Sequence, residues 1–194
     1  LFAKNGRHPE TRVDNYTEWG RRGGWSSSSG RGWANLSNAP FRMYKRYTHE
    51  GGVATPLIVH WPAGMKARGE LRHSPGHLID IAPTCLAAAG LEGKGMEGQS
   101  LLPVLAGDQK EERTLYWEHE GNRAVRKGDY KLVAIHNTPW ELYDMSKDRS
   151  ELKNLSSAMP KKAEELRSAY EVWAKRVGAK PWDEVNVKKK KNTD

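Results

Sequence analysis

The spacing that most clearly suggests chemistry is a lysine followed, after four residues, by Glu-Gly-Gly. Lys45 precedes this triplet at 50–52, and the apolar run "PLIVHW" at 56–61 comes next. A loop that joins such a run is where open α/β sheets hold ligands, and glycines there allow close approach of the backbone. An ammonium group suits a tetrahedral oxyanion such as sulfate or phosphate. The pattern alone leaves the alternative open, because most lysines are simply solvated.

A second polar cluster is the stretch "EHEGNR" at 118–123, which offers acid, base and anion-binding groups. Its composition is also that of an ordinary exposed hairpin tip. Four histidines are too scattered for metal-ligand spacing: His49, His60, His73 and His77. The lone Cys85 excludes an intrachain disulfide, and its apolar setting predicts a buried structural thiol. The sequence contains neither Gly-x-Ser-x-Gly nor a phosphate-binding glycine loop.

The elements that must position these groups begin with an α/β layer. The run at 56–61 has the length and the β-branched content of a strand buried on both faces of a parallel sheet. The helix expected in "HLIDIAPTCLAAAGLEG" has Asp80 at its N-terminus, Pro83 in its first turn and Gly90 at its C-terminus. A strand followed by this helix indicates the edge of an α/β layered domain.

After residue 107 the pattern changes to short runs separated by turn residues: "TLYWEH", "NRAVRK", "YKLVAI" and "WELYD". Their spacing predicts an antiparallel four-stranded meander. A final amphipathic helix is expected from about Pro160, because apolar residues recur at intervals of three and four: Ala163, Leu166, Tyr170 and Trp173. Packed on one face of the four strands, this helix gives a small α+β subdomain.

The composition limits which classes of binding partner are expected. The net charge of +8 comes partly from "KKKK" at 188–191, which favours a solvated basic tail over a nucleic-acid partner. No apolar run approaches the roughly eighteen residues that span a membrane. No signal peptide is visible, and "LFAKNG" at the start resembles the end of a strand. We therefore expect the chain to begin inside a longer protein.

Several of these stretches, in order, resemble the C-terminal half of the arylsulfatase family: "GWANLSNAPFRMYKRYTHEGGVATPLIVHWPAG", "GHLIDIAPTCLAAAG", "GQSLLPVLAG", "LYWEHEGNRAVRKGDYKLV" and "WELYDMSKDRSELKNL". The resemblance runs from about Trp33 to Trp182. It implies an α/β fold, part of an alkaline-phosphatase-like α/β/α sandwich plus a small C-terminal antiparallel four-stranded sheet packed by a helix. The implied domains are 1–107, the C-terminal part of the catalytic α/β domain, 108–180, the sheet-and-helix subdomain, and 181–194, a basic tail.

The resemblance also implies a sulfuric ester hydrolase and assigns roles to individual residues. Lys45 corresponds to the family lysine that contacts the sulfate and stabilises charge on the leaving oxygen as the S–O bond breaks. His119 and Arg123 are expected to bind substrate, since the corresponding region of the family lies beside the mouth of the active site. The family's calcium is held by aspartates and by an Asp-Asn pair at a strand end. Here Lys4 takes the aspartate position, which leaves Asn5 as the candidate metal ligand.

The family's nucleophile is a cysteine or serine, converted to formylglycine, within Cys/Ser-x-Pro-x-Arg. No such motif occurs in the 194 residues. We therefore expect the nucleophile and most calcium ligands to lie in an N-terminal part. The chain alone is expected to be inactive, to bind calcium weakly or not at all, and to aggregate. The resemblance further implies a periplasmic or secreted enzyme, with a sulfated small molecule or sulfated glycan as substrate.

Two other functions fit the same residues. One is a non-catalytic binding module for acidic glycans, which would use the basic surface and the aromatic, glycine-rich stretch at 7–40. The other is a phosphoesterase of the same superfamily. Turnover of an aryl sulfate, compared with that of an aryl phosphate, separates the three functions.

Overall fold

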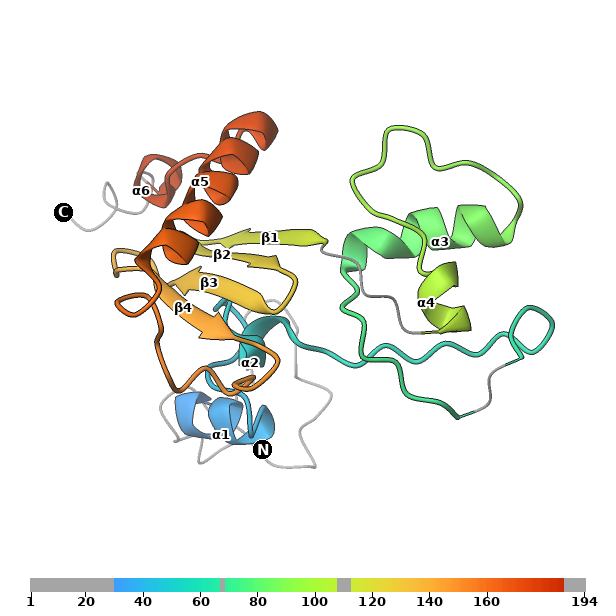
Figure 1. Cartoon of the computed structure of the whole chain (residues 1–194), viewed down its shortest axis with the longest axis horizontal. Helices are drawn as coiled ribbons and strands as arrows, with labels where there is room; N and C mark the ends of the chain where they lie inside the picture. Colours follow the sequence, from blue (N-terminus) through green and yellow to red (C-terminus); the bar gives the residue numbers. More distant parts are fainter. Residues whose placement is uncertain (1–29, 67–68, 108–112, 187–194) are drawn as a thin grey trace, which may run out of the picture. The chain divides into compact units, whose positions relative to one another are not determined.

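The computed structural model describes residues 30–66, 69–107 and 113–186. These residues belong to two compact units, Leu1–Ala54 with Tyr116–Asp194 and Thr55–Leu115. We call the first the sheet unit and the second the helical unit (Figure 1). Asn5, the candidate metal ligand, and the lysine run at 188–191 lie outside the described residues.

The sheet unit is built on an antiparallel sheet with the strand order β1-β2-β3-β4. The strands are Thr114–His119 (β1), Asn122–Lys127 (β2), Tyr130–Ala134 (β3) and Glu141–Asp144 (β4). β3 pairs antiparallel with both β2 and β4, so that Leu132 lies opposite Val125 on one side and Leu142 on the other. Turns at Gly121 and Gly128, both with positive φ, join the first three strands. The predicted meander is confirmed.

Side chains alternate between the two faces of this sheet, and each face has its own core. One face carries Val125, Leu132 and Leu142, which cluster with Leu166 and Tyr170 of α5 (Pro160–Val177). The apolar stripe predicted for this helix is thereby confirmed. The opposite face carries a second cluster: Ala124, Val133, Tyr143 and Met145. Figure 1 shows α5 on one side of the sheet and the segment with α1 (Gly30–Ser37) and α2 (Glu50–Val53) on the other.

The ends of α5 follow from its sequence. Pro160 occupies the first turn, where its missing N–H leaves no hydrogen bond unmade. Gly178 ends the helix with φ +71°, a left-handed conformation that favours glycine. A short helix, α6 (Trp182–Val185), follows.

The helical unit contains a 3₁₀ turn, η3 (Leu78–Asp80), followed by α3 (Ile81–Ala88) and α4 (Leu102–Ala106). The predicted helix is confirmed, although Asp80 makes no side-chain cap at the start of α3. Its carboxylate instead accepts the backbone N–H groups of His77 (2.7 Å) and Gln99 (2.9 Å) and pairs with Arg113. Burial raises the pKa of Asp80, but these hydrogen bonds outweigh it and leave the pKa below its ordinary value.

The predicted buried strand at 56–61 is wrong. In the part of the chain that the structure describes, no strand pairs with this segment, and Leu57 and Ile58 are 56% and 90% exposed. A strand needs a hydrogen-bonded neighbour, which an apolar run cannot supply by itself. The prediction of a buried thiol is also wrong, since Cys85 is exposed. Pro83 is the buried residue of α3, so most of that helix's surface remains uncovered within the helical unit.

Candidate active-site loop

Lys45 is exposed on the loop between α1 and α2. The backbone is left-handed on either side of it, with φ +67° at Met43 and +100° at Arg46. Neither residue is glycine, so both conformations are costly and persist only where surrounding contacts impose them. Within the same loop the rings of Tyr44 and Tyr47 pack edge to face, with centroids 5.3 Å apart. The loop therefore holds a defined, strained shape around the lysine.

The two glycines of the triplet are required because backbone segments approach each other closely. A Cβ at Gly51 would lie 2.2 Å from the carbonyl oxygen of Met43, and a Cβ at Gly52 would lie 1.9 Å from that of Tyr47. The N–H of Gly51 donates to the carbonyl of Arg42 at 3.0 Å. Only residues that lack a Cβ allow the start of α2 to lie directly against the loop that carries the lysine.

Glu50, the first residue of the triplet, is buried in a network of ion pairs on the sheet. Its carboxylate lies 3.0 Å from Nζ of Lys131, a residue of β3, and 3.3 Å from the guanidinium of Arg149. Nζ of Lys131 also lies 2.9 Å from Oε1 of Glu151, an ion pair without hydrogen-bond geometry. Oε2 of Glu151 accepts the backbone N–H of Glu50 at 2.9 Å. The buried ammonium of Lys131 is thus shared by two buried carboxylates.

The two carboxyl groups that share Lys131 differ in their pKa. Burial raises the pKa of Glu50, but the charges and hydrogen bonds of Lys131 and Arg149 outweigh it and hold the pKa below its ordinary value. Burial also raises the pKa of Glu151, and Lys131 offsets this only in part, so that its pKa stays above the ordinary value. Glu50, at the base of the loop that carries Lys45, therefore keeps its negative charge to lower pH than Glu151 does.

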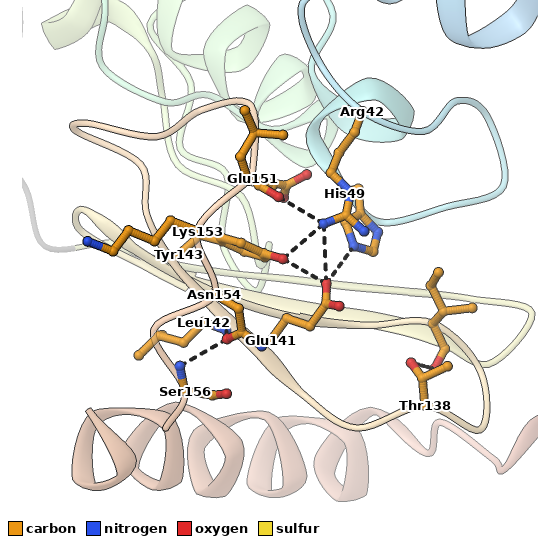
Figure 2. Close-up of polar contacts among 12 residues, drawn as sticks. Arg42, His49, Thr138, Glu141, Leu142, Tyr143, Glu151, Lys153, Asn154 and Ser156 are labelled. Carbon is orange, nitrogen blue, oxygen red and sulfur yellow. Dashed lines mark hydrogen bonds and ion pairs between the residues drawn. The ribbon is translucent and has the colours of Figure 1, made fainter. Parts of the chain in front are cut away.

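A second cluster, drawn in Figure 2, fixes the other end of the loop. The guanidinium of Arg42 donates to the hydroxyl of Tyr143 at 2.9 Å and to the backbone carbonyl of Glu151 at 2.8 Å. The Tyr143 hydroxyl donates to Glu141 at 2.9 Å, and Nε2 of His49 lies 3.3 Å from the same carboxylate. Burial lowers the pKa of His49 to about 4 even though the hydrogen bond to Glu141 opposes this shift. His49 is therefore neutral at neutral pH.

The start of β2 and the turn before it provide a third attachment, directly beside the lysine. Nδ2 of Asn122 donates to the backbone carbonyl of Arg46 at 3.2 Å. The guanidinium of Arg46 lies 2.6 Å from the carboxylate of Glu120. The loop is thus held at both ends and at the residue that follows Lys45.

The two residues predicted to bind substrate, His119 and Arg123, lie in different surroundings. His119 is exposed at the end of β1. The guanidinium of Arg123 lies 4.6 Å from the ring centre of Trp140, a residue that packs on the α5 face of the sheet. Asn122 and Arg123 point to opposite faces because they are consecutive in a strand. The structure therefore brings Asn122 to the lysine loop and directs Arg123 away from it, and substrate binding by His119 and Arg123 stays a prediction.

The described residues do not fit a calcium site. None of them form a group of three or more His, Cys, Asp or Glu that could hold a metal ion. Asn5 falls outside the described residues.

Among the residues that the structure describes, no helix has both the length and the apolar character that crossing a membrane requires.

The sequence pattern indicated Lys45 and the triplet but not the partners of Glu50. One signal was available for Lys131, which interrupts the otherwise apolar run of the predicted strand "YKLVAI". A lysine in such a position is either exposed or paired inside. We find no comparable local signal for Glu151, which directly follows a turn and adopts φ +56°.

Comparison with known proteins agrees with this architecture. Residues 41–171 match the family model described as N-sulphoglucosamine sulphohydrolase, C-terminal. An uncharacterized sulfatase of Schizosaccharomyces pombe is 31% identical over 163 residues, which cover 75% of this chain and 29% of that protein. N-acetylgalactosamine-6-sulfatase of Mus musculus is 33% identical over 135 residues, covering 66% of this chain and 26% of that protein. The chain thus spans between a quarter and a third of the length of these curated relatives.

Solved structures show the same fold. The crystal structure of Ps i-CgsB matches with a TM-score of 0.64 and 25% identity, covering 72% of this chain and 34% of that chain. A structure from work on glycosaminoglycan metabolism by Bacteroides thetaiotaomicron matches with a TM-score of 0.57 and 22% identity, over 66% of this chain and 31% of that chain. The predicted fold class, part of an alkaline-phosphatase-like α/β fold with a four-stranded sheet, is confirmed. The chain belongs to the sulfatase family and contains the C-terminal part that the family model describes.

Proposed function

We propose that the protein to which this chain belongs hydrolyses a sulfate ester, on a glycan or on a small molecule. The observation that carries the proposal is Lys45, an exposed ammonium on a loop that is held at both ends and beside the lysine itself. Family membership supports the reaction class. The names of two relatives, N-acetylgalactosamine-6-sulfatase and N-acetylglucosamine-6-O-sulfatase, support a sulfated amino-sugar glycan as the substrate.

The role proposed for Lys45 is electrostatic. When the S–O bond of a sulfate ester breaks, negative charge develops on the leaving oxygen. A cation fixed beside that oxygen stabilises the transition state more than the ground state, which raises kcat. Because the backbone of the lysine loop is already fixed, little reorganisation is needed as the charge develops.

Other parts of the active site are proposed on family grounds. In sulfatases a formylglycine supplies the nucleophile and calcium polarises the sulfate. We assign both to residues outside those described, since the described residues contain no cluster that fits a metal ion. A periplasmic or secreted location is proposed on the same grounds.

The proposal is tested by Lys45→Ala in the full-length protein. We expect kcat on an aryl sulfate to fall by about 10²–10³-fold, the usual cost of removing one group that stabilises developing charge. Lys127→Ala is the matched control, because Lys127 forms a partly exposed ion pair with Glu165 of α5, on the other face of the sheet. Unchanged turnover in folded Lys45→Ala would refute the assigned role.

The same assay separates the alternative functions. Faster turnover of the matching aryl phosphate would indicate a phosphoesterase. Binding of an acidic glycan without turnover of either ester would indicate a binding module.

We further propose that His119 and Arg123 influence which sulfate ester is accepted. Arg123→Ala in the full-length protein should reduce kcat/KM for an anionic glycan more than for a small aryl sulfate. The stacking of Arg123 on Trp140 supplies the competing explanation, a purely structural role. Equal losses on both substrates would favour that explanation, and His119→Ala, at an exposed position, provides the second measurement.

A further inference from the structure

We propose that Glu50, Lys131 and Glu151 are positioning residues for Lys45, and that they act by locking the base of its loop onto the centre of the sheet. The inference rests on the proposed function of Lys45. The C-terminal sheet then has an indirect part in the reaction, through the backbone of the loop and without any contact with substrate.

The two ends of the loop meet on one residue, Glu151. The backbone N–H of Glu50 donates to the Glu151 side chain, and the guanidinium of Arg42 donates to the Glu151 backbone carbonyl. The N–H of Gly51 also donates to the carbonyl of Arg42. The segment from Arg42 to Gly51, with Lys45 inside it, is therefore a closed ring anchored on Glu151.

Glu151 is itself fixed by Lys131. Glu151 adopts φ +56°, a conformation that a non-glycine residue keeps only under constraint. Its buried carboxylate lies 2.9 Å from Nζ of Lys131. Lys131 lies in β3, where the ladders pair it with Arg126 of β2 and Tyr143 of β4. The ammonium thus projects from a backbone held on both sides, so that the anchor of the loop is rigid.

Stability alone accounts poorly for these buried charges. Buried ion pairs contribute little net stability, because desolvation of the charges offsets their attraction, and apolar residues of similar size often serve as well. In some proteins such groups serve instead to specify a single conformation. Here the geometry that they fix is that of the strained backbone flanking Lys45, at Met43 and Arg46.

A double-mutant cycle in the full-length protein tests this inference. Glu50→Gln keeps the size of the side chain and removes its charge. If Glu50 acts through Lys45, Glu50→Gln should lower kcat on an aryl sulfate by about tenfold, as expected for a displaced catalytic group, with KM changed much less. The same substitution in a Lys45→Ala background should cause no further loss. Lys131→Arg, which keeps the positive charge, should retain more activity than Lys131→Met.

Each outcome decides a different question. A loss of the same factor in both backgrounds, or no loss in either, would overturn the positioning role while leaving Lys45 catalytic. No effect of Lys45→Ala itself would overturn the proposed function of Lys45, and the inference with it. If Glu50→Gln does not fold, Glu151→Gln replaces it in the cycle, because it removes the charge that pairs with Lys131 and keeps the size of the side chain. A loss that depends on Lys45 then supports the inference, and any other result overturns it.

Discussion

Leu132 and Leu166 of the sheet unit are completely buried, whereas Ile58 of the helical unit is 90% exposed. Buried charges occur in both units, and Lys131 in the sheet unit is enclosed by two carboxylates. The helical unit has its own buried carboxylate, Asp80, which is satisfied by two backbone N–H groups and one arginine. The sheet unit thus completes its core with its own residues, whereas the helical unit organises its turns but leaves apolar side chains such as Ile58 exposed.

The difference shows what kind of apolar pattern builds a core by itself. The four strands of the meander are adjacent in sequence, so each finds its neighbour across a short turn, and α5 then covers one face. The run at 56–61 is at least as apolar, but a strand of a parallel sheet depends on partners that are distant in sequence. Equal hydrophobicity therefore leads to unequal burial.

Breaking the buried ion cluster should give the largest effect on stability. Lys131→Met leaves Glu50 and Glu151 without their shared cation, and we expect the sheet unit to lose about 3–5 kcal/mol of unfolding free energy. Hydrogen exchange should therefore accelerate at the amides of β2 and β3 and remain unchanged in α3. Accelerated exchange in α3 as well would show that the two units unfold together.

Core truncation should separate the units more directly. Leu166→Ala removes a fully buried side chain of α5, and we expect a loss of about 2–5 kcal/mol. Ile58→Ala in the same 194-residue chain should change the free energy of unfolding by less than about 0.5 kcal/mol, because the side chain is exposed. Urea unfolding of both variants measures the contrast, which comparable losses would contradict.

Acid should weaken the sheet unit through His49. Its pKa is about 4 in the folded protein against an ordinary 6.5, so between these pH values the unfolded state binds more protons and stability falls as the pH falls. The full shift corresponds to roughly 3 kcal/mol. Glu151, whose pKa is raised, acts in the opposite direction, so the difference between wild type and His49→Gln isolates the histidine. That difference should shrink from pH 7 to pH 4, and a constant difference would contradict the assignment.

Much of the fold followed from local sequence patterns. The turn residues and alternating runs predicted the four strands, and the three-and-four spacing predicted α5 together with the face that it buries. The glycine pair that follows Lys45 predicted that backbone segments approach each other closely here, which the Cβ distances at Gly51 and Gly52 explain. These features depend on residues that are near one another in the chain, which is why they could be predicted.

Tertiary structure alone decided how the lysine loop is held. Glu50 meets Lys131 across 81 positions of sequence and Glu151 across 101, and no local period encodes which charged residues will meet. Packing likewise decided that Asn122 faces the loop while Arg123 stacks on Trp140. The alternation of side chains along a strand places these two residues on opposite faces of the sheet, but it does not determine which face the loop covers. The sequence by itself determined the family and the exposed lysine. The long-range contacts that fix the backbone around Lys45 were decided only when distant segments packed, because the energy of an ion pair depends on separation in space.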